Sequence, residues 1–179
     1  MSEYTAIYLR KKGEPLLKYR HISWEDTVEM TKEEVVALHD EVHEYNRKVD
    51  AELGCELFCL NTTPSRQLEV LPYSEDPRLL TIDMLAEILD FYDEEIEERR
   101  QFIKMDEEEL IVLENRIRMA DVKLYDKISQ EIFEIKNGLP ESRETMEVLR
   151  SLRGRFEFVA NMMQDKDNAE KYELVYTKS

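Results

Sequence analysis

The sequence predicts an α+β fold that is predominantly helical, with a small antiparallel sheet built from both chain ends and a long antiparallel helical hairpin or coiled coil. The 179 residues include only four Gly and five Pro, and so few helix breakers favour long helices. Residues 79–137 contain neither breaker, and apolar residues recur there every three or four positions, which is the period of an amphipathic helix. The two chain ends alternate apolar and polar residues instead, as strands do.

The first 22 residues are expected to form a β-hairpin. The runs "YTAIYLRK" and "LLKYRHI" are rich in aliphatic and aromatic residues, which favour strands. Gly13 and Pro15 lie between them and suit a turn. The C-terminal run "KYELVYTKS" is similar in composition to the first run, so we expect the two chain ends to pair as well.

A helix is expected to begin after Thr31 and to end at Gly54. Thr31 and Glu34 have the spacing of a capping box, in which each side chain accepts a hydrogen bond from the backbone N–H of the other residue. The helix carries one apolar stripe at spacings of three and four: Val35, Leu38, Val42, Tyr45, Val49 and Leu53. Beyond Gly54, the runs "CELFCLN" and "RQLEVLPY" on either side of "TTPS" are expected to be strands.

The long helical region is expected to start at Asp76, as the N-cap, with Pro77 at the first helical position. The motif "MDEEEL" at 105–110 contains residues that could cap a second helix. Two alternatives therefore stay open for this region: two helices broken near residue 105, or a single helix of about 57 residues.

The motif "NGLPE" is expected to end this region, with Gly138 as the C-cap residue and Pro140 two positions beyond it. A last helix over residues 141–164 then folds back antiparallel on the preceding one, because the connection is short. The apolar stripes are heptad-like, which permits coiled-coil packing within the chain or between chains. We expect two domains: a small α+β domain of residues 1–76 with 168–179, and a helical extension of residues 77–167.

The charge of the chain is its most informative feature. It holds 41 acidic and 25 basic residues, a net charge of −16, so it repels nucleic acid and anionic membranes at long range and attracts basic surfaces. Residues 83–114 contain thirteen acids and three bases. A carboxylate stripe recurs there at spacings of four and three: Asp83, Glu87, Asp90, Glu94 and Glu97.

This stripe has two interpretations. It is either the solvated outer face of an amphipathic helix or a binding face for a basic groove, because carboxylates one helical turn apart, about 5–6 Å, approximate the spacing of phosphates along a nucleic-acid strand. The expected partner contacts on the second interpretation are Asp83, Glu87, Asp90, Asp93, Glu94, Glu97, Glu98, Glu107, Glu108 and Glu109.

A histidine pair raises the question of a metal site. His39 and His43 in "VALHDEVHEY" are four residues apart and share a helix face, a spacing that suits two zinc ligands. A zinc protease needs Glu directly after the first His as the general base, but Asp40 stands there. We therefore expect both histidines to lie at the edge of the core or in solvent, and we predict no metal ligand.

No other motif indicates an enzyme. Cys55 and Cys59 lie about 13 Å apart if the segment is a strand, too far for a disulfide, and buried free thiols are expected. The four glycines are scattered, so no phosphate-binding loop or dinucleotide fingerprint forms. Because these binding motifs are missing, no cofactor is expected. There is no apolar signal region at the N-terminus and no apolar run of membrane-spanning length, which predicts a cytoplasmic protein.

The opening "YTAIYLRKKGEPLLKYRHISW", followed by a capped helix and a charged helical tail, resembles small uncharacterised accessory proteins of Gram-positive phages and prophages. The resemblance covers residues 1–35. It implies a viral accessory protein that acts in the host cytoplasm, a class that includes inhibitors of host defence such as anti-CRISPR proteins. No functional residue carries over, because the resemblance has no diagnostic motif.

Together with the resemblance, these observations predict a non-enzymatic acidic binding protein, a phage-encoded inhibitor that docks its carboxylate-rich helical face on the basic groove of a nucleic-acid-handling host protein. One alternative is a structural or oligomerisation protein, in which the helical stripes form a homodimer and the charge only solubilises. A third class is a metal-dependent enzyme that uses His39 and His43.

Overall fold

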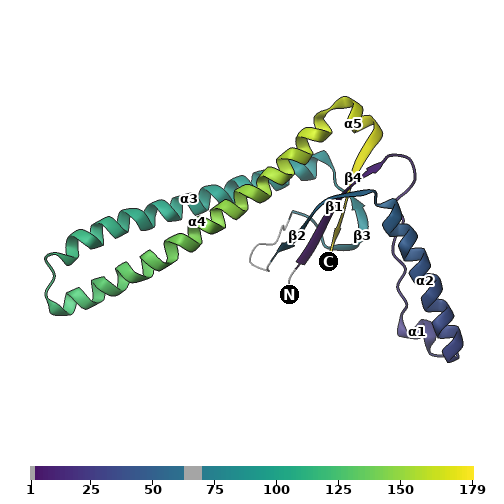
Figure 1. Ribbon diagram of the computed structural model, residues 1–179, viewed down its shortest axis with the longest axis horizontal. Coiled ribbons are helices and arrows are strands. Elements are labelled where there is room, and N and C mark those ends of the chain that lie inside the picture. Colours follow the sequence, from purple (N-terminus) through teal and green to yellow (C-terminus); the bar gives the residue numbers. More distant parts are fainter. Residues whose placement is uncertain (1–2, 63–69) are drawn as a thin grey trace. The chain divides into compact units, whose positions relative to one another are not determined.

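The computed structural model describes residues 3–62 and 70–179 (Figure 1). It confirms the predicted class: long helices dominate, and a small antiparallel sheet joins the chain ends. The elements in chain order are β1 Glu3–Lys11, α1 Trp24–Thr27, α2 Lys32–Glu52, β2 Cys55–Thr62, β3 Ser74–Leu79, α3 Ile82–Ile117, α4 Val122–Gln164, α5 Lys166–Lys171 and β4 Tyr172–Lys178. The chain divides into two compact units, Met1–Leu85 with Asn161–Ser179, and Ala86–Ala160.

The sheet of the first unit has the strand order β2-β1-β4-β3, and all its pairs are antiparallel. The predicted pairing of the chain ends is confirmed, because β1 lies between β2 and β4. Beyond β4, the backbones of Tyr4 and Ser179 exchange hydrogen bonds of 2.8 and 2.9 Å. Ala6, Ile7 and Val175 are fully buried at the centre of the sheet, where central strands have both edges paired.

The predicted N-terminal hairpin is wrong, because the run "LLKYRHI" forms no strand. Part of this segment runs along α2 instead. The side-chain amide of Asn46 bridges the backbone of Arg20: its Oδ1 accepts from the Arg20 N–H at 2.9 Å, and its Nδ2 donates to the Arg20 carbonyl at 2.9 Å. The side chain thus supplies bonds that a strand partner would have made, and the partners of β1 come from distant parts of the chain.

Helix α2 begins and ends where the sequence predicted. The capping box is present: the Thr31 N–H donates to Glu34 Oε2 at 2.7 Å, and the Glu34 N–H donates to Thr31 Oγ1 at 3.3 Å. Gly54 has φ +88°, and a Cβ there would lie 2.2 Å from the Leu9 carbonyl oxygen. Glycine is therefore required by both the backbone conformation and the close approach of β1.

The strand that follows β2 begins later in the sequence than predicted. Cys55–Thr62 is a strand as expected, but residues 66–69 of the predicted run "RQLEVLPY" lie outside the described residues, and residues 70–73 are not in a strand. The strand is Ser74–Leu79 and includes Pro77, so the predicted helix start there is wrong. Because β3 is an edge strand, the missing N–H of proline is tolerated. Helix α3 begins instead after Thr81, whose Oγ1 accepts from the Met84 N–H at 3.2 Å.

The helical hairpin is antiparallel, as predicted, but its turn lies elsewhere. Helix α3 continues without a break past residue 105, and the chain reverses at residues 118–121, where Asp121 Oδ1 accepts from the Leu124 N–H at 2.9 Å. Both alternatives for this region are therefore wrong. Helix α4 also runs through Gly138 and Pro140, so the predicted helix end there is wrong.

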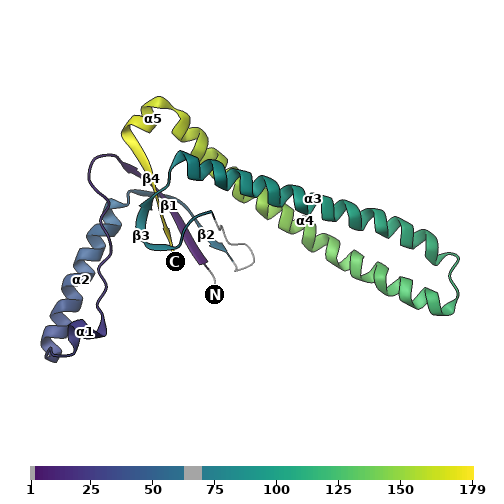
Figure 2. The same ribbon diagram turned by 180° about the vertical axis from the view of Figure 1, so that it is seen from behind.

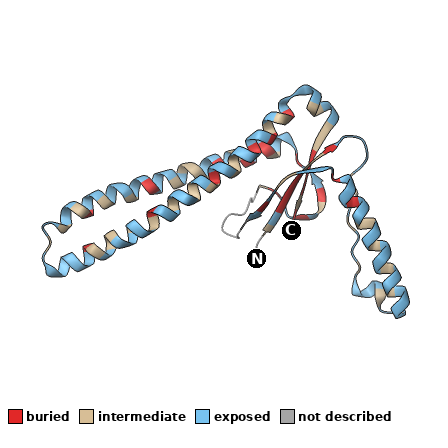
Figure 3. Ribbon diagram, viewed as in Figure 1, coloured by how far each residue is buried: buried red, intermediate tan, exposed pale blue. Residues whose placement is uncertain are grey.

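The continuation of α4 through Gly138 and Pro140 has a packing explanation. Interior Pro costs about 3 kcal/mol and Gly about 1 kcal/mol relative to Ala. Leu139 and Leu149 on either side of Pro140 are buried, whereas Pro140 itself is exposed. Burial of this apolar seam against α3 offsets the local propensity. In both views of the chain α3 and α4 run side by side (Figures 1 and 2), and buried residues are sparse along them (Figure 3).

Candidate functional site

The seam between α3 and α4 determines which side chains remain available on the hairpin. Its buried residues on α3 are Ile88, Tyr92, Ile103 and Leu113, and those on α4 are Ile128, Leu139, Leu149, Phe156 and Val159. The rings of Tyr92 and Phe156 stack with centroids 5.8 Å apart. Burial raises the pKa of Tyr92, so this phenol stays protonated and acts as a packing residue.

Three ion pairs join α3 to α4 along one edge of the seam. Arg153 Nε lies 2.5 Å from Asp93 Oδ1, Arg143 Nη2 lies 2.6 Å from Glu107 Oε1, and Lys136 Nζ lies 2.8 Å from Glu114 Oε1. As the α3 residue number rises the α4 number falls, which is the register of an antiparallel pair. Asp93 and Glu107, both predicted as partner contacts, therefore already have cationic partners inside the hairpin.

The middle of the predicted carboxylate stripe lies on a different face of α3, away from the seam. Glu87, Asp90 and Glu94 are exposed, as is Glu98 beside them. Within residues 3–62 and 70–179, no basic side chain lies within 4.0 Å of any of these four carboxylates. We call Glu87, Asp90, Glu94 and Glu98 the outer carboxylate cluster.

The ends of the predicted stripe differ from its middle. Asp83 is exposed in the first turn of α3 and belongs to the other compact unit. Glu97 is partly buried, and hydrogen bonds from the side chains of Gln101 and Arg100 lower its pKa. At the next positions of the stripe stand Gln101 and Lys104, so the row of carboxylates ends there.

The predicted contacts Glu107, Glu108 and Glu109 form a separate group. Glu107 pairs with Arg143, and Glu108 Oε1 lies 3.8 Å from Lys104 Nζ. Glu109 is exposed, and no ion pair to it is found among the described residues. Of the ten predicted contacts, four form the outer carboxylate cluster, Asp83 and Glu97 lie at the ends of the stripe, Asp93 lies at the edge of the seam, and Glu107, Glu108 and Glu109 form this second acidic group.

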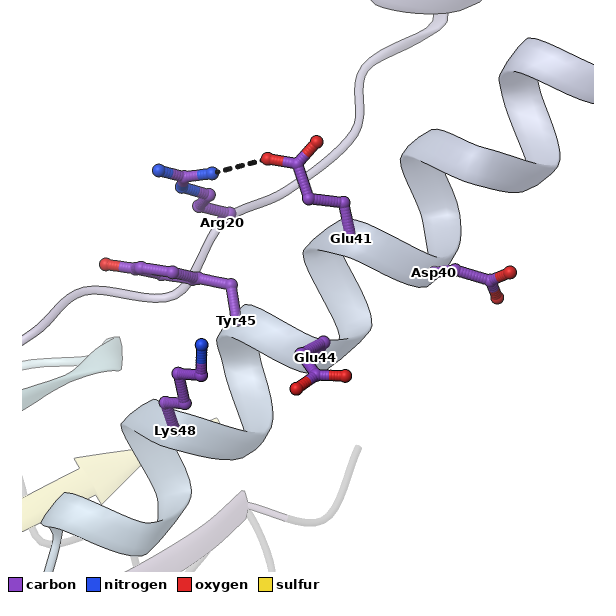
Figure 4. A pocket seen from close by; sticks show the side chains of 6 residues that line it. All are labelled: Arg20, Asp40, Glu41, Glu44, Tyr45 and Lys48. Carbon is purple, nitrogen blue, oxygen red and sulfur yellow. Dashed lines mark hydrogen bonds and ion pairs between the residues drawn. The ribbon is translucent and has the colours of Figure 1, made fainter.

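The histidine pair lies on the solvent side of α2. His39 and His43 are both exposed, and the described part of the chain contains no group of three His, Cys, Asp or Glu side chains that could hold a metal ion. An open depression on α2 is lined by neither histidine but by Arg20, Asp40, Glu41, Glu44, Tyr45 and Lys48 (Figure 4).

This depression on α2 is explained by chain packing. The Arg20 guanidinium stacks 4.2 Å from the centre of the Tyr45 ring and lies 3.3 Å from Glu41 (Figure 4). These contacts hold the extended N-terminal segment against the helix. The lining mixes both signs of charge, so it selects no class of ligand.

The two cysteines on β2 are free, but both are exposed, so the expectation that they are buried is wrong. A hydrogen bond with the Cys59 side chain raises the pKa of Tyr4 to about 12. Cys59 thus faces a protonated phenol, which cannot serve as the general base that a nucleophilic thiol needs near neutral pH.

The structure also exposes apolar residues that the sequence patterns did not single out. Phe102, Met105, Val112 and Met119 are each more than half exposed on α3 and its following turn. None of them belongs to the three-and-four stripes that predicted the hairpin. A second apolar periodicity beside the first was the signal that could have found them.

No family model, curated protein or solved structure matches this chain in the three comparisons with known proteins. Among the described residues, no helix combines the length and the apolar character that a membrane crossing requires.

Proposed function

We propose that this chain is a non-enzymatic binding protein that docks the outer carboxylate cluster of α3 on a basic surface of a protein partner. The observation that carries the proposal is the state of Glu87, Asp90 and Glu94, which are exposed and have no cation within 4.0 Å among the described residues. Unpaired carboxylates keep their field and their acceptor capacity for a partner.

The spacing of these carboxylates indicates the class of partner. Successive members lie about one helical turn apart, roughly 5–6 Å, and this pitch approximates the row of phosphates on one nucleic-acid strand. We therefore propose a basic groove that handles nucleic acid, on a host protein if the chain is a phage accessory protein. The net charge of −16 steers association with such a groove and opposes direct contact with nucleic acid.

The energetics of α3 support a role beyond solvation. Like charges at spacings of three and four destabilise a helix by a few tenths of a kcal/mol per pair. Along the edge of the seam, where α4 is within reach, carboxylates of α3 pair with Arg153, Arg143 and Lys136 of α4. Among the described residues, no cation compensates the outer face in this way, as expected for a surface that is paired only in a complex.

The test is charge reversal with a matched control. One variant replaces Glu87, Asp90, Glu94 and Glu98 by Lys, and the control variant replaces four exposed acids elsewhere, Asp40, Glu44, Glu141 and Glu144, by Lys. Both variants have the same net charge, so only the position of the reversal differs. Asp93 and Glu107 are left intact because they hold the hairpin together.

Partners that copurify with the unmodified chain from a lysate are identified by mass spectrometry, and binding to the isolated partner is measured across a salt series. The outer-face variant should bind at least roughly tenfold more weakly, and heparin should compete with the unmodified chain because both occupy one basic groove. Equal loss of binding in both variants would mean that total charge, and not this face, drives the association.

A further inference from the structure

A stripe of apolar side chains runs along one face of α3 and is left uncovered by α4. Phe102, Met105, Val112 and Met119 are each more than half exposed, and Met119 is 94% exposed. Their spacings of three and seven residues place them on one helix face. The helical turn continues through Met119, because its N–H donates to the Arg116 carbonyl at 3.1 Å. We call these four residues the α3 apolar stripe.

Two opposite charges lie within this stripe. Glu109 and Arg116 occupy the same helix face, at the positions that complete alternating spacings of three and four from Phe102 to Met119. Both are exposed, and neither has an ion-pair partner among the described residues. In chain order, this face therefore presents apolar Phe102 and Met105, acidic Glu109, apolar Val112, basic Arg116 and apolar Met119.

This order is complementary to itself when it is reversed. If a second copy lies antiparallel with its centre at Val112, Met105 of each copy lies opposite Met119 of the other, and Glu109 lies opposite Arg116. In the sequence, the midpoints of Met105 and Met119, of Glu109 and Arg116, and of Phe102 and Met119 all lie within about two residues of Val112. This is about 3 Å along the helix. A two-fold interface requires such a pattern, because each contact occurs twice with the roles exchanged.

We propose that the α3 apolar stripe is a self-association surface that pairs antiparallel with the same stripe of a second copy. Local charge favours this occupant. Residues 99–133 contain eight acids and seven bases, although the whole chain has a net charge of −16. A second copy thus meets little repulsion here, and a strongly basic partner gains little attraction.

The surface predicts a weak, concentration-dependent dimer. Four partly exposed apolar side chains per copy are few compared with the roughly 20–30 residues a side of a stable interface. The stripe uses none of Glu87, Asp90, Glu94 and Glu98, although Glu98 lies one helical turn before Phe102. The two proposals rest on different residues and fail independently.

The first test introduces a charge at the centre of the stripe. Sedimentation velocity of the full chain is measured over a roughly hundredfold concentration range, for the unmodified protein, for Val112→Glu and for Phe158→Glu. Phe158 is an exposed aromatic residue on α4 and serves as the matched control. The unmodified chain and Phe158→Glu should associate with rising concentration, and Val112→Glu should stay monomeric with unchanged helical content.

The second test exchanges the charges. Glu109→Arg and Arg116→Glu should each weaken self-association, because each places like charges opposite one another. The double variant should recover it. An equimolar mixture of the two single variants should form a heterodimer, since one stripe is then wholly basic and the other wholly acidic. Any one of four results would overturn the antiparallel dimer. The unmodified chain could be a monomer at every concentration, or Val112→Glu could associate as the unmodified chain does. The double variant could associate as weakly as the single variants, or the two single variants could fail to pair on mixing.

Discussion

Arg153 on α4 binds Asp93 on α3 through Nε at 2.5 Å and Nη2 at 3.3 Å, and it also lies 3.1 Å from Glu157 on its own helix. The hydrogen bonds to Asp93, and then those to Glu157, raise the pKa of Arg153. This two-pronged contact ties the helices together beside the stacked rings of Tyr92 and Phe156. Asp93 is therefore already paired within the hairpin and is less available to a binding partner than the exposed carboxylates of the outer carboxylate cluster.

Replacing Arg153 by Ala should destabilise the hairpin modestly. Its side chain is 27% exposed, and both charge pairing and packing of its stem are lost, so we expect about 1 kcal/mol in the free energy of unfolding at low salt. The difference should shrink as salt rises. Arg155→Ala is the control, because Arg155 is exposed and has no ion pair among the described residues. Equal effects of the two substitutions in urea melts would contradict an interhelical role.

Gly154→Ala should stabilise the hairpin. Among the described residues, nothing lies within 4 Å of a Cβ built at Gly154, which is not among the glycines of positive φ. The gain expected for Gly to Ala in an open helix interior is about 0.5–1 kcal/mol. Thermal melts followed by circular dichroism should show a higher midpoint. A lower midpoint would mean that Gly154 is needed for a close approach that this structure does not contain.

Gly54→Ala should have the opposite effect. A Cβ at Gly54 would approach Leu9 O and Arg10 Cα to 2.2 and 2.8 Å, and the backbone there has φ +88°. We expect a loss of at least roughly 1–3 kcal/mol, since strain and a backbone clash add. The same melts measure it. Gly13→Ala separates strain from clash, because Gly13 also has a positive φ, +152°, but a Cβ there would meet no described residue within 4 Å, so the loss should be smaller. A Gly54→Ala protein as stable as the unmodified chain would rule out this close approach.

Lys178 on β4 should contribute measurably to the stability of the sheet. Its ammonium is buried, donates to the Leu71 carbonyl at 3.0 Å and lies 3.2 Å from Glu3 Oε2. Lys178→Met leaves the Glu3 carboxylate and the Leu71 carbonyl without this cation, and we expect a loss of roughly 1–3 kcal/mol. Lys166→Met, at an exposed position in α5, should leave unfolding by urea unchanged. If the two substitutions behave alike, the buried ion pair contributes nothing to stability.

The cap of α2 should weaken in acid. Hydrogen bonds from the Thr31 backbone N–H and hydroxyl lower the pKa of Glu34 below its ordinary value of 4.5. A carboxylate with a depressed pKa stabilises the fold above its unfolded pKa, and this contribution is lost as the pH falls through the lower folded value. The stability difference between the unmodified chain and Glu34→Ala should therefore be largest near neutral pH and shrink below about pH 4.5. A difference that does not change between pH 7 and pH 3 would show that the carboxylate is not the capping group.

The sequence by itself determined the helices and strands whose signals are local. The Thr31–Glu34 capping box and the glycine at 54 define α2, and the alternating chain ends predicted β1 and β4 and their pairing. The heptad-like stripes indicated helices that pack on one another, whereas the antiparallel direction was predicted from a short connection at Gly138–Pro140 that the structure places inside α4. These signals depend on the period of apolar side chains and on the hydrogen bonds of a few neighbouring residues, so they can be read without knowledge of distant contacts.

The tertiary structure decided where local rules compete with packing. Pro77 lies in an edge strand and Pro140 inside a helix, because an unpaired sheet edge tolerates a missing N–H and because burial of the seam outweighs the cost of a lost helical hydrogen bond. It also decided which of the ten predicted carboxylates have a cationic partner among the described residues, since Arg153 and Arg143 reach α3 from positions far along the chain. Periodicity predicts the face of a helix, but only the register between two helices determines which charges on that face already have a partner.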